Sequence, residues 1–117
     1  MLQFTDDGDP DQRWQLVNAG SGYFNVINSN SGKALDNPGG STADGTQMQQ
    51  WTIWGTGNNN QQWLISPVGD GWYTVQNRTS GKVLDVREGS VSDTTAIQQW
   101  TYFTGNPNQQ FKFVPYN

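Results

Sequence analysis

Short apolar stretches alternate with polar turns along the whole chain. Each stretch contains only a few apolar side chains and is bounded by Gly, Asn or Ser, as in residues 23–28, which are followed by the polar run 29–32. No stretch maintains the 3.6-residue apolar period of an amphipathic helix, so little helix is expected. The pattern predicts an all-β domain built from short strands and tight turns.

The boundaries of the strands follow from the turn residues. The expected strands are residues 14–17, 23–28, 33–36, 47–53, 62–66, 72–77, 82–86, 96–103 and 110–114, with a remnant of one more at 1–4. Gly32 and Gly81 each end a polar run between two expected strands. A glycine there can supply the positive φ that a hairpin connection needs.

The strand pattern repeats itself along the chain. The positions that recur 49 residues later are Tyr23 (as Trp72), Val26, Asn28, Gly32, Leu35, Asp36, Gln49, Gln50 and Trp51. Beyond Trp51 the offset falls to 48, and residues 11–16 align with residues 60–65. The chain therefore reads as one domain, residues 1–117, with a partial unit at about 1–20 and whole units at about 21–69 and 70–117.

Aromatic residues compensate for a low apolar content. Only 32% of the residues are hydrophobic, but six are Trp, five Phe and four Tyr. Large rings bury much area each, so the core is expected to be aromatic. Trp14, Trp63 and Phe111 occupy matching positions of the three units, and we expect them to fill a shared interior.

Charge and composition exclude several classes of function. Ten acidic against six basic residues give a net charge of −4, which argues against nucleic acids as partners. Cysteine and histidine are absent, so thiol and imidazole catalysis are excluded. No apolar run approaches a membrane span, and residues 1–4 lack the features of a signal peptide.

Residues 6–11 are rich in Asp, but without the distal glutamate of a calcium loop they are interpreted as a solvated turn. No metal or cofactor is expected.

A Leu-Asp pair, a Gln-Gln-Trp triplet and an Asn-Gln-Gln-aromatic run appear in this order in both whole units. In the last unit they are Leu84-Asp85, Gln98-Gln99-Trp100 and Asn108-Gln109-Gln110-Phe111. In this order and period they resemble the ricin B-type lectins and the related bacterial carbohydrate-binding modules. The resemblance covers essentially the whole chain. It implies a β-trefoil with pseudo-threefold symmetry, here with an incomplete first repeat, and secretion with a signal that was removed or belongs to a parent polypeptide.

The resemblance also implies two sugar sites. Its aspartate, aromatic and asparagine positions are Asp85, Trp100 and Asn108 in the third unit, and Asp36, Trp51 and Asn60 in the second. Gln109 and Gln61 would brace the aspartates, and Gln98 and Gln49 would line the pockets, with Phe103 and Trp54 near the rims. A carboxylate, an amide and an aromatic face suit a pyranose, because its hydroxyls donate hydrogen bonds and its C–H side packs on a ring.

The two sites are not expected to be equal. Val86-Arg87 after Asp85 is closer to the family pattern than Asn37-Pro38 after Asp36, and no site is expected in the opening unit, which lacks a Leu-Asp pair. We further expect both aspartates to lie at surface strand ends, where their removal leaves the fold intact. The competing interpretation is a turn aspartate that bonds its own backbone.

Three functions compete at this stage. The leading one is non-catalytic binding of galactose-, xylose- or similar pyranose-containing glycans. A glycoside hydrolase would need two carboxyls close together across one bond, whereas Asp36 and Asp85 belong to different units. The remaining alternative is a trefoil used for protein contact or oligomer assembly. The incomplete first unit would leave barrel edges open, so the expectation is either a homo-oligomer, with or without exchanged strands, or an engineered or truncated fragment of a longer lectin.

Overall fold

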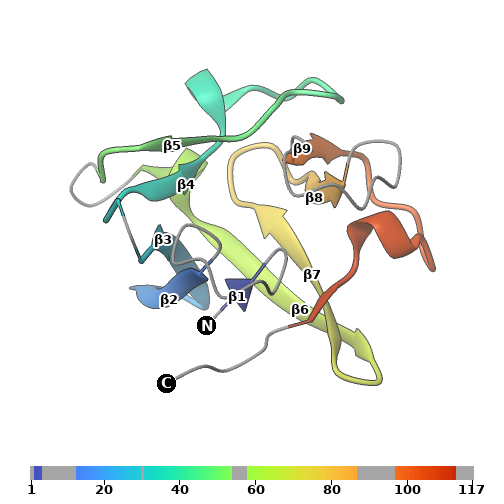
Figure 1. Cartoon of the computed structure of the whole chain (residues 1–117). Helices are drawn as coiled ribbons and strands as arrows, with labels where there is room; N and C mark the ends of the chain where they lie inside the picture. The colour runs from blue at the N-terminus through green and yellow to red at the C-terminus, as the bar shows by residue number, and fades with distance from the viewer. Residues whose placement is uncertain (1, 4–12, 30, 54–57, 87–96, 113–117) are drawn as a thin grey trace.

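A computed structural model of the chain describes residues 2–3, 13–29, 31–53, 58–86 and 97–112 (Figure 1). Its strands are β1 (Leu2–Gln3), β2 (Arg13–Gly20), β3 (Tyr23–Asn28), β4 (Ala34–Asp36), β5 (Gln49–Trp51), β6 (Trp63–Gly69), β7 (Trp72–Asn77), β8 (Val83–Val86), β9 (Ile97–Trp100) and β10 (Phe111–Lys112). Helical structure in the described part is limited to three 3-10 turns, η2 (Pro38–Gly40), η3 (Asn59–Gln61) and η5 (Pro107–Gln109). The all-β prediction is confirmed.

Two long hairpins and two short ones organise the sheet. The long hairpins β2–β3 and β6–β7 are joined by pairing between β3 and β6, and β10 pairs with β7. The short hairpins β4–β5 and β8–β9 are attached to β3 and β7, and Figure 1 shows them along the top of the long strands. Each of the two whole units therefore contributes one short hairpin, which is attached to the second strand of a long hairpin.

The core forms where the apolar faces of the units meet. Trp14, Trp63 and Phe111 are all buried, together with pairs of matching residues from the two whole units, Val26 with Val75 and Leu35 with Leu84. The indole Nε1 of Trp63 donates a hydrogen bond to the Leu35 carbonyl at 3.1 Å, so its one polar atom is satisfied inside. The predicted aromatic core is confirmed.

The hairpin ends lie outside the predicted strand limits. β2 and β6 run three residues past the expected ends, at residues 17 and 66, into turns centred on Ser21 and Asp70, whose φ is 57° in both. Flanking glycines with positive φ, such as Gly20 and Gly22, allow the tight reversal. β5 is shorter than predicted because Gln47 and Met48 pair instead with β9 of the next unit.

Candidate functional site

Cross-strand pairing brings the predicted site residues together. Asp85 on β8 lies directly opposite Gln98 on β9. Trp100 follows Gln98 by two residues, so it projects from the same face of the hairpin. The intervening Gln99 projects from the opposite face and is completely buried. In the second unit the register is identical, with Asp36 opposite Gln49 and with Trp51 two residues further on.

The glutamine after each asparagine braces the aspartate. Gln109 Nε2 donates to Asp85 Oδ2 at 3.1 Å and to the Thr101 carbonyl at 2.9 Å. Gln61 Nε2 makes the equivalent bonds, to Asp36 Oδ2 at 2.9 Å and to the Thr52 carbonyl at 3.0 Å. Both glutamines are completely buried in the 3-10 turns η5 and η3. A buried amide that ties a carboxylate to a strand carbonyl fixes the position of both.

Both aspartates are more deeply placed than the sequence suggested. Asp36 is 2% exposed and Asp85 is 5% exposed, so the expectation of surface carboxylates was wrong. Their oxygens accept hydrogen bonds from side chains distant in sequence, such as Gln98 at 3.3 Å and Gln49 at 3.0 Å. These contacts differ from the local backbone bond of a turn aspartate, the alternative considered for these positions.

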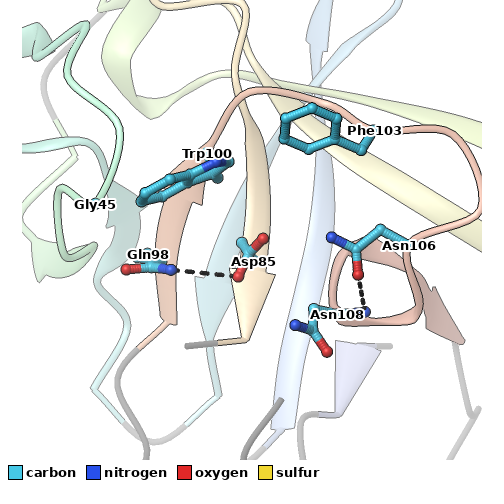
Figure 2. A pocket seen from close by; sticks show the side chains of 7 residues that line it. All are labelled: Gly45, Asp85, Gln98, Trp100, Phe103, Asn106 and Asn108. Atoms are coloured by element: carbon cyan, nitrogen blue, oxygen red, sulfur yellow. Dashed lines mark hydrogen bonds between the residues drawn. The ribbon is translucent and has the colours of Figure 1, made fainter. Parts of the chain in front are cut away.

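The third-unit pocket is the larger of the two. It has a volume of about 520 Å³ and is lined by Gly45, Asp85, Gln98, Trp100, Phe103, Asn106 and Asn108. Figure 2 shows the Trp100 ring and the Gln98 amide on one side of Asp85, and Phe103, Asn106 and Asn108 on the other. Trp100 is 36% exposed, which leaves its ring available to a ligand.

The second-unit pocket is the smaller one. Its volume is about 280 Å³, and the described residues that line it are Asp36, Gly39, Gln49, Trp51 and Asn60. Trp51 is 49% exposed. Trp54, predicted near the rim, lies outside the described residues, as do residues 6–11 and Asp11 of the opening unit.

The two carboxylates differ in how much hydrogen-bonding capacity remains. Asp36 accepts from three amides, because Asn60 Nδ2 donates to its Oδ2 at 3.2 Å in addition to Gln49 and Gln61. Asp85 accepts from the side chains of Gln98 and Gln109, and no hydrogen bond joins it to Asn108 in the described structure. An ionised carboxylate offers about four acceptor positions. Asp85 therefore keeps more acceptor capacity for a ligand, and the ranking of the two sites stays a prediction.

Three residues that line the pockets were missed by the sequence analysis. Gly39 belongs to η2, Gly45 comes from the loop between β4 and β5 and reaches into the pocket of the next unit, and Asn106 precedes η5. The only sequence signal among them was Asn106 directly before Pro107, a pattern typical of the start of a helical turn. Nothing in the sequence pointed to Gly45, because its contact crosses between units.

Both pockets combine hydrogen-bonding side chains with an aromatic face. Amide-braced carboxylates accept hydrogen bonds, amide groups donate them, and exposed indole rings offer flat apolar surfaces. Among the described residues, no three acidic side chains gather in the manner of a metal site. In the same part of the chain, no helix is long and apolar enough to cross a membrane.

Known proteins share this fold and these repeats. The model of the family described as ricin-type beta-trefoil lectin domain-like matches residues 10–100 and 59–117. A designed threefold-symmetric protein, ThreeFoil, is 40% identical with a TM-score of 0.88, and the alignment covers 98% of this chain and 80% of that one. A comparison with curated proteins gives no match.

Two natural structures are also similar. An exo-beta-1,3-galactanase from Clostridium thermocellum is 42% identical with a TM-score of 0.85, over 94% of this chain and 23% of the enzyme. A Polyporus squamosus lectin, bound in its crystal to a human-type influenza-binding epitope, is 25% identical with a TM-score of 0.78, over 93% of this chain and 38% of the lectin. The chain thus spans less than half of either natural protein.

These similarities confirm the predicted β-trefoil and support carbohydrate binding in general. The family match extends over both whole units and reaches the end of the chain. The repeats that carry it are the ones that build the two pockets. The chain belongs to the ricin-type beta-trefoil lectin domain-like family.

Proposed function

We propose that the chain is a non-catalytic carbohydrate-binding module that recognises galactose-, xylose- or similar pyranose-containing glycans at two sites. The third-unit site consists of Asp85, Gln98, Trp100, Asn108 and Gln109, and the second-unit site of Asp36, Gln49, Trp51, Asn60 and Gln61. The observation that carries the proposal is the pairing, in each pocket, of an amide-braced carboxylate with an exposed tryptophan.

Within each site the residues have different roles. The carboxylate accepts hydrogen bonds from adjacent sugar hydroxyls, and the indole ring packs on the C–H face of the pyranose. In the third unit the amide of Asn108 completes the polar contacts, while Gln109 holds Asp85 and does not reach the ligand because it is completely buried. Galactose is a reasonable first ligand because one similar protein is a galactanase.

Catalysis is disfavoured by the separation of the acidic groups. Hydrolysis of a glycosidic bond needs two carboxyls about 5 to 10 Å apart across one substrate. Asp36 and Asp85 line different pockets, and each pocket has a single acidic residue in its described lining. A sugar-release assay on galactan and xylan is therefore expected to give no product.

A glycan array followed by titration calorimetry tests the proposal. The intact protein is expected to bind pyranose glycans, and a double variant, Trp51→Ala with Trp100→Ala, is expected to lose this binding while it keeps its circular dichroism spectrum. An array that stays blank at high protein concentration would contradict carbohydrate binding. It would favour the alternative, a trefoil that serves protein contact or assembly.

A further inference from the structure

The side chain of Asn106 is held in one orientation at the rim of the third-unit pocket. Its Oδ1 accepts a hydrogen bond from the backbone N–H of Asn108 at 3.0 Å and so caps the turn η5. The Asn106 backbone N–H donates to the Phe103 carbonyl at 3.2 Å, and the Phe103 N–H donates to Oε1 of the buried Gln109 at 2.9 Å. The rim is therefore anchored to the same glutamine that braces Asp85.

Because Oδ1 faces Asn108, the amide nitrogen of Asn106 must face the other way. Figure 2 shows this nitrogen pointing into the pocket, toward Asp85. Among the described residues, no hydrogen bond involves Asn106 Nδ2, and the side chain is only partly buried. The pocket thus presents a fixed pair of N–H donors across from a carboxylate acceptor.

The second unit has the same residue type without the same constraint. Asn58 precedes η3 at the matching position, but its side chain makes no cap hydrogen bond, and the described pocket lining does not include it. The position of Pro107, which fixes φ at the start of η5, is taken by Asn59 in the second unit. The second-unit pocket is also about half as large, at about 280 Å³ against about 520 Å³.

We propose that Asn106, together with the exposed ring of Phe103, forms a subsite for a second pyranose, so that the third-unit site binds a disaccharide while the second-unit site binds a single sugar. The inference rests on the proposed function. The first sugar lies over Trp100 and donates its hydroxyls to Asp85. The second sugar lies on the other side of Asp85, where Asn106 Nδ2 donates to one of its oxygens and Phe103, which is 55% exposed, contacts its C–H face.

Asn106→Asp is a selective test of this subsite. An aspartate keeps the oxygen that caps Asn108, because Asp and Asn are equally good at this position, but it replaces the two N–H donors with an acceptor. Asn106→Ser also keeps a capping oxygen and adds no charge. Both variants are made in a Trp51→Ala background, so that calorimetry reports the third-unit site alone. The ligands are galactose with β-1,3-galactobiose, and xylose with β-1,4-xylobiose.

The background protein is expected to bind one of the two disaccharides more tightly than its monosaccharide. Both Asn106 variants should reduce that preference about fivefold, the change that one neutral hydrogen bond of about 1 kcal/mol supplies, and leave monosaccharide affinity unchanged. Asn58→Asp adds the same charge at the matching position of the second unit. It should change neither the disaccharide affinity nor the monosaccharide affinity of the third-unit site.

Two results would overturn the subsite: an unchanged disaccharide preference in both variants, or an equal loss for monosaccharide and disaccharide. The second result would place Asn106 in the primary site or in its scaffold. A Trp51→Ala protein that binds none of the four sugars, although it is folded, would contradict the proposed function itself and the subsite with it.

Discussion

Asp85 combines deep burial with incomplete hydrogen bonding, and this combination determines what its replacement does. A buried carboxylate is stable only when donors surround it. Here Gln98 and Gln109 supply two donors, and the remaining acceptor positions face a pocket of about 520 Å³. The residue therefore has two tasks at once, because it holds the hairpin in register and it offers acceptors to a sugar.

Asp85→Ala is expected both to weaken sugar binding and to destabilise the hairpin. Loss of a charged hydrogen-bond acceptor costs about 2 to 3 kcal/mol of binding, which is most of a millimolar interaction. Buried Gln109 also loses its carboxylate partner, so the melting temperature should fall as well. Calorimetry in the Trp51→Ala background and thermal unfolding measure the two effects. Binding equal to that of the background protein would place the sugar site elsewhere.

The paired tryptophans allow binding to be separated from folding. Trp100→Ala and Trp51→Ala truncate rings that are 36% and 49% exposed. Loss of a stacking tryptophan costs about 2 kcal/mol or more of a millimolar interaction, so each variant should abolish measurable sugar binding at its own site with little change in melting temperature. Calorimetry with one monosaccharide, together with thermal unfolding, checks both statements. A large fall in the melting temperature would show that these rings belong to the scaffold.

At the scale of elements, the third-unit site is built by two units. The loop between β4 and β5 packs along β9, where Gly45 N–H donates to the Gln99 carbonyl at 2.8 Å. The Asp44 carboxylate accepts from the Thr101 N–H at 2.8 Å and forms an ion pair with Lys82 at 3.2 Å. Thr101 follows Trp100 directly, so Asp44 helps to position the strand end that carries the stacking ring.

The pKa of Asp44 gives this contact a pH dependence. Desolvation raises the pKa, but hydrogen bonds from Thr101 and the nearby Lys82 cation outweigh it, and the net pKa lies below the usual 3.8. A lowered folded-state pKa means that the stabilisation is present above the unfolded-state value and is lost as pH falls through the folded-state value. Asp44→Asn should therefore lower the melting temperature at pH 7, and the gap to the parent protein should close as the pH falls below the lowered pKa of Asp44. A gap that is constant with pH would show that the charge of Asp44 has no role.

The sequence predicted the parts of the site that repeat and missed those that cross between units. Asp36 and Asp85 could be found because the same residues recur at a fixed offset. The same repeat sets the strand register, which places each aspartate opposite a glutamine. The contact of Gly45 with the next unit has no such signal, because neither partner is marked by its neighbours in sequence. Burial of the aspartates was missed although their glutamine partners, 13 to 25 residues away, were predicted, because burial depends on how the turns pack against the strands.

At the scale of the whole molecule, the open barrel edges expected from the repeat pattern predict association. A strand with an unpaired edge is a site for association. We expect a dimer or larger oligomer whose proportion rises with concentration, measured by light scattering coupled to size-exclusion chromatography. A monodisperse monomer at high concentration, with cooperative unfolding, would contradict this expectation.

Two sites on one rigid fold should favour long glycans over single sugars. Each site alone is expected to bind a monosaccharide at about millimolar Kd, or about −4 kcal/mol, because a shallow pocket makes few contacts. A polymeric glycan that reaches both pockets binds the second one at a high effective concentration, so its affinity should be about 100-fold higher or more.

Calorimetry should give two monosaccharides per chain, and Trp51→Ala should lose most of the advantage of the polymer while its remaining site keeps its monosaccharide affinity. This variant also separates the effect from oligomerisation, because an oligomer of single-site chains remains multivalent between chains. A polymer advantage in Trp51→Ala that exceeds the disaccharide preference of the third-unit site would therefore be assigned to the oligomer, and a stoichiometry of one sugar per chain would contradict the second site.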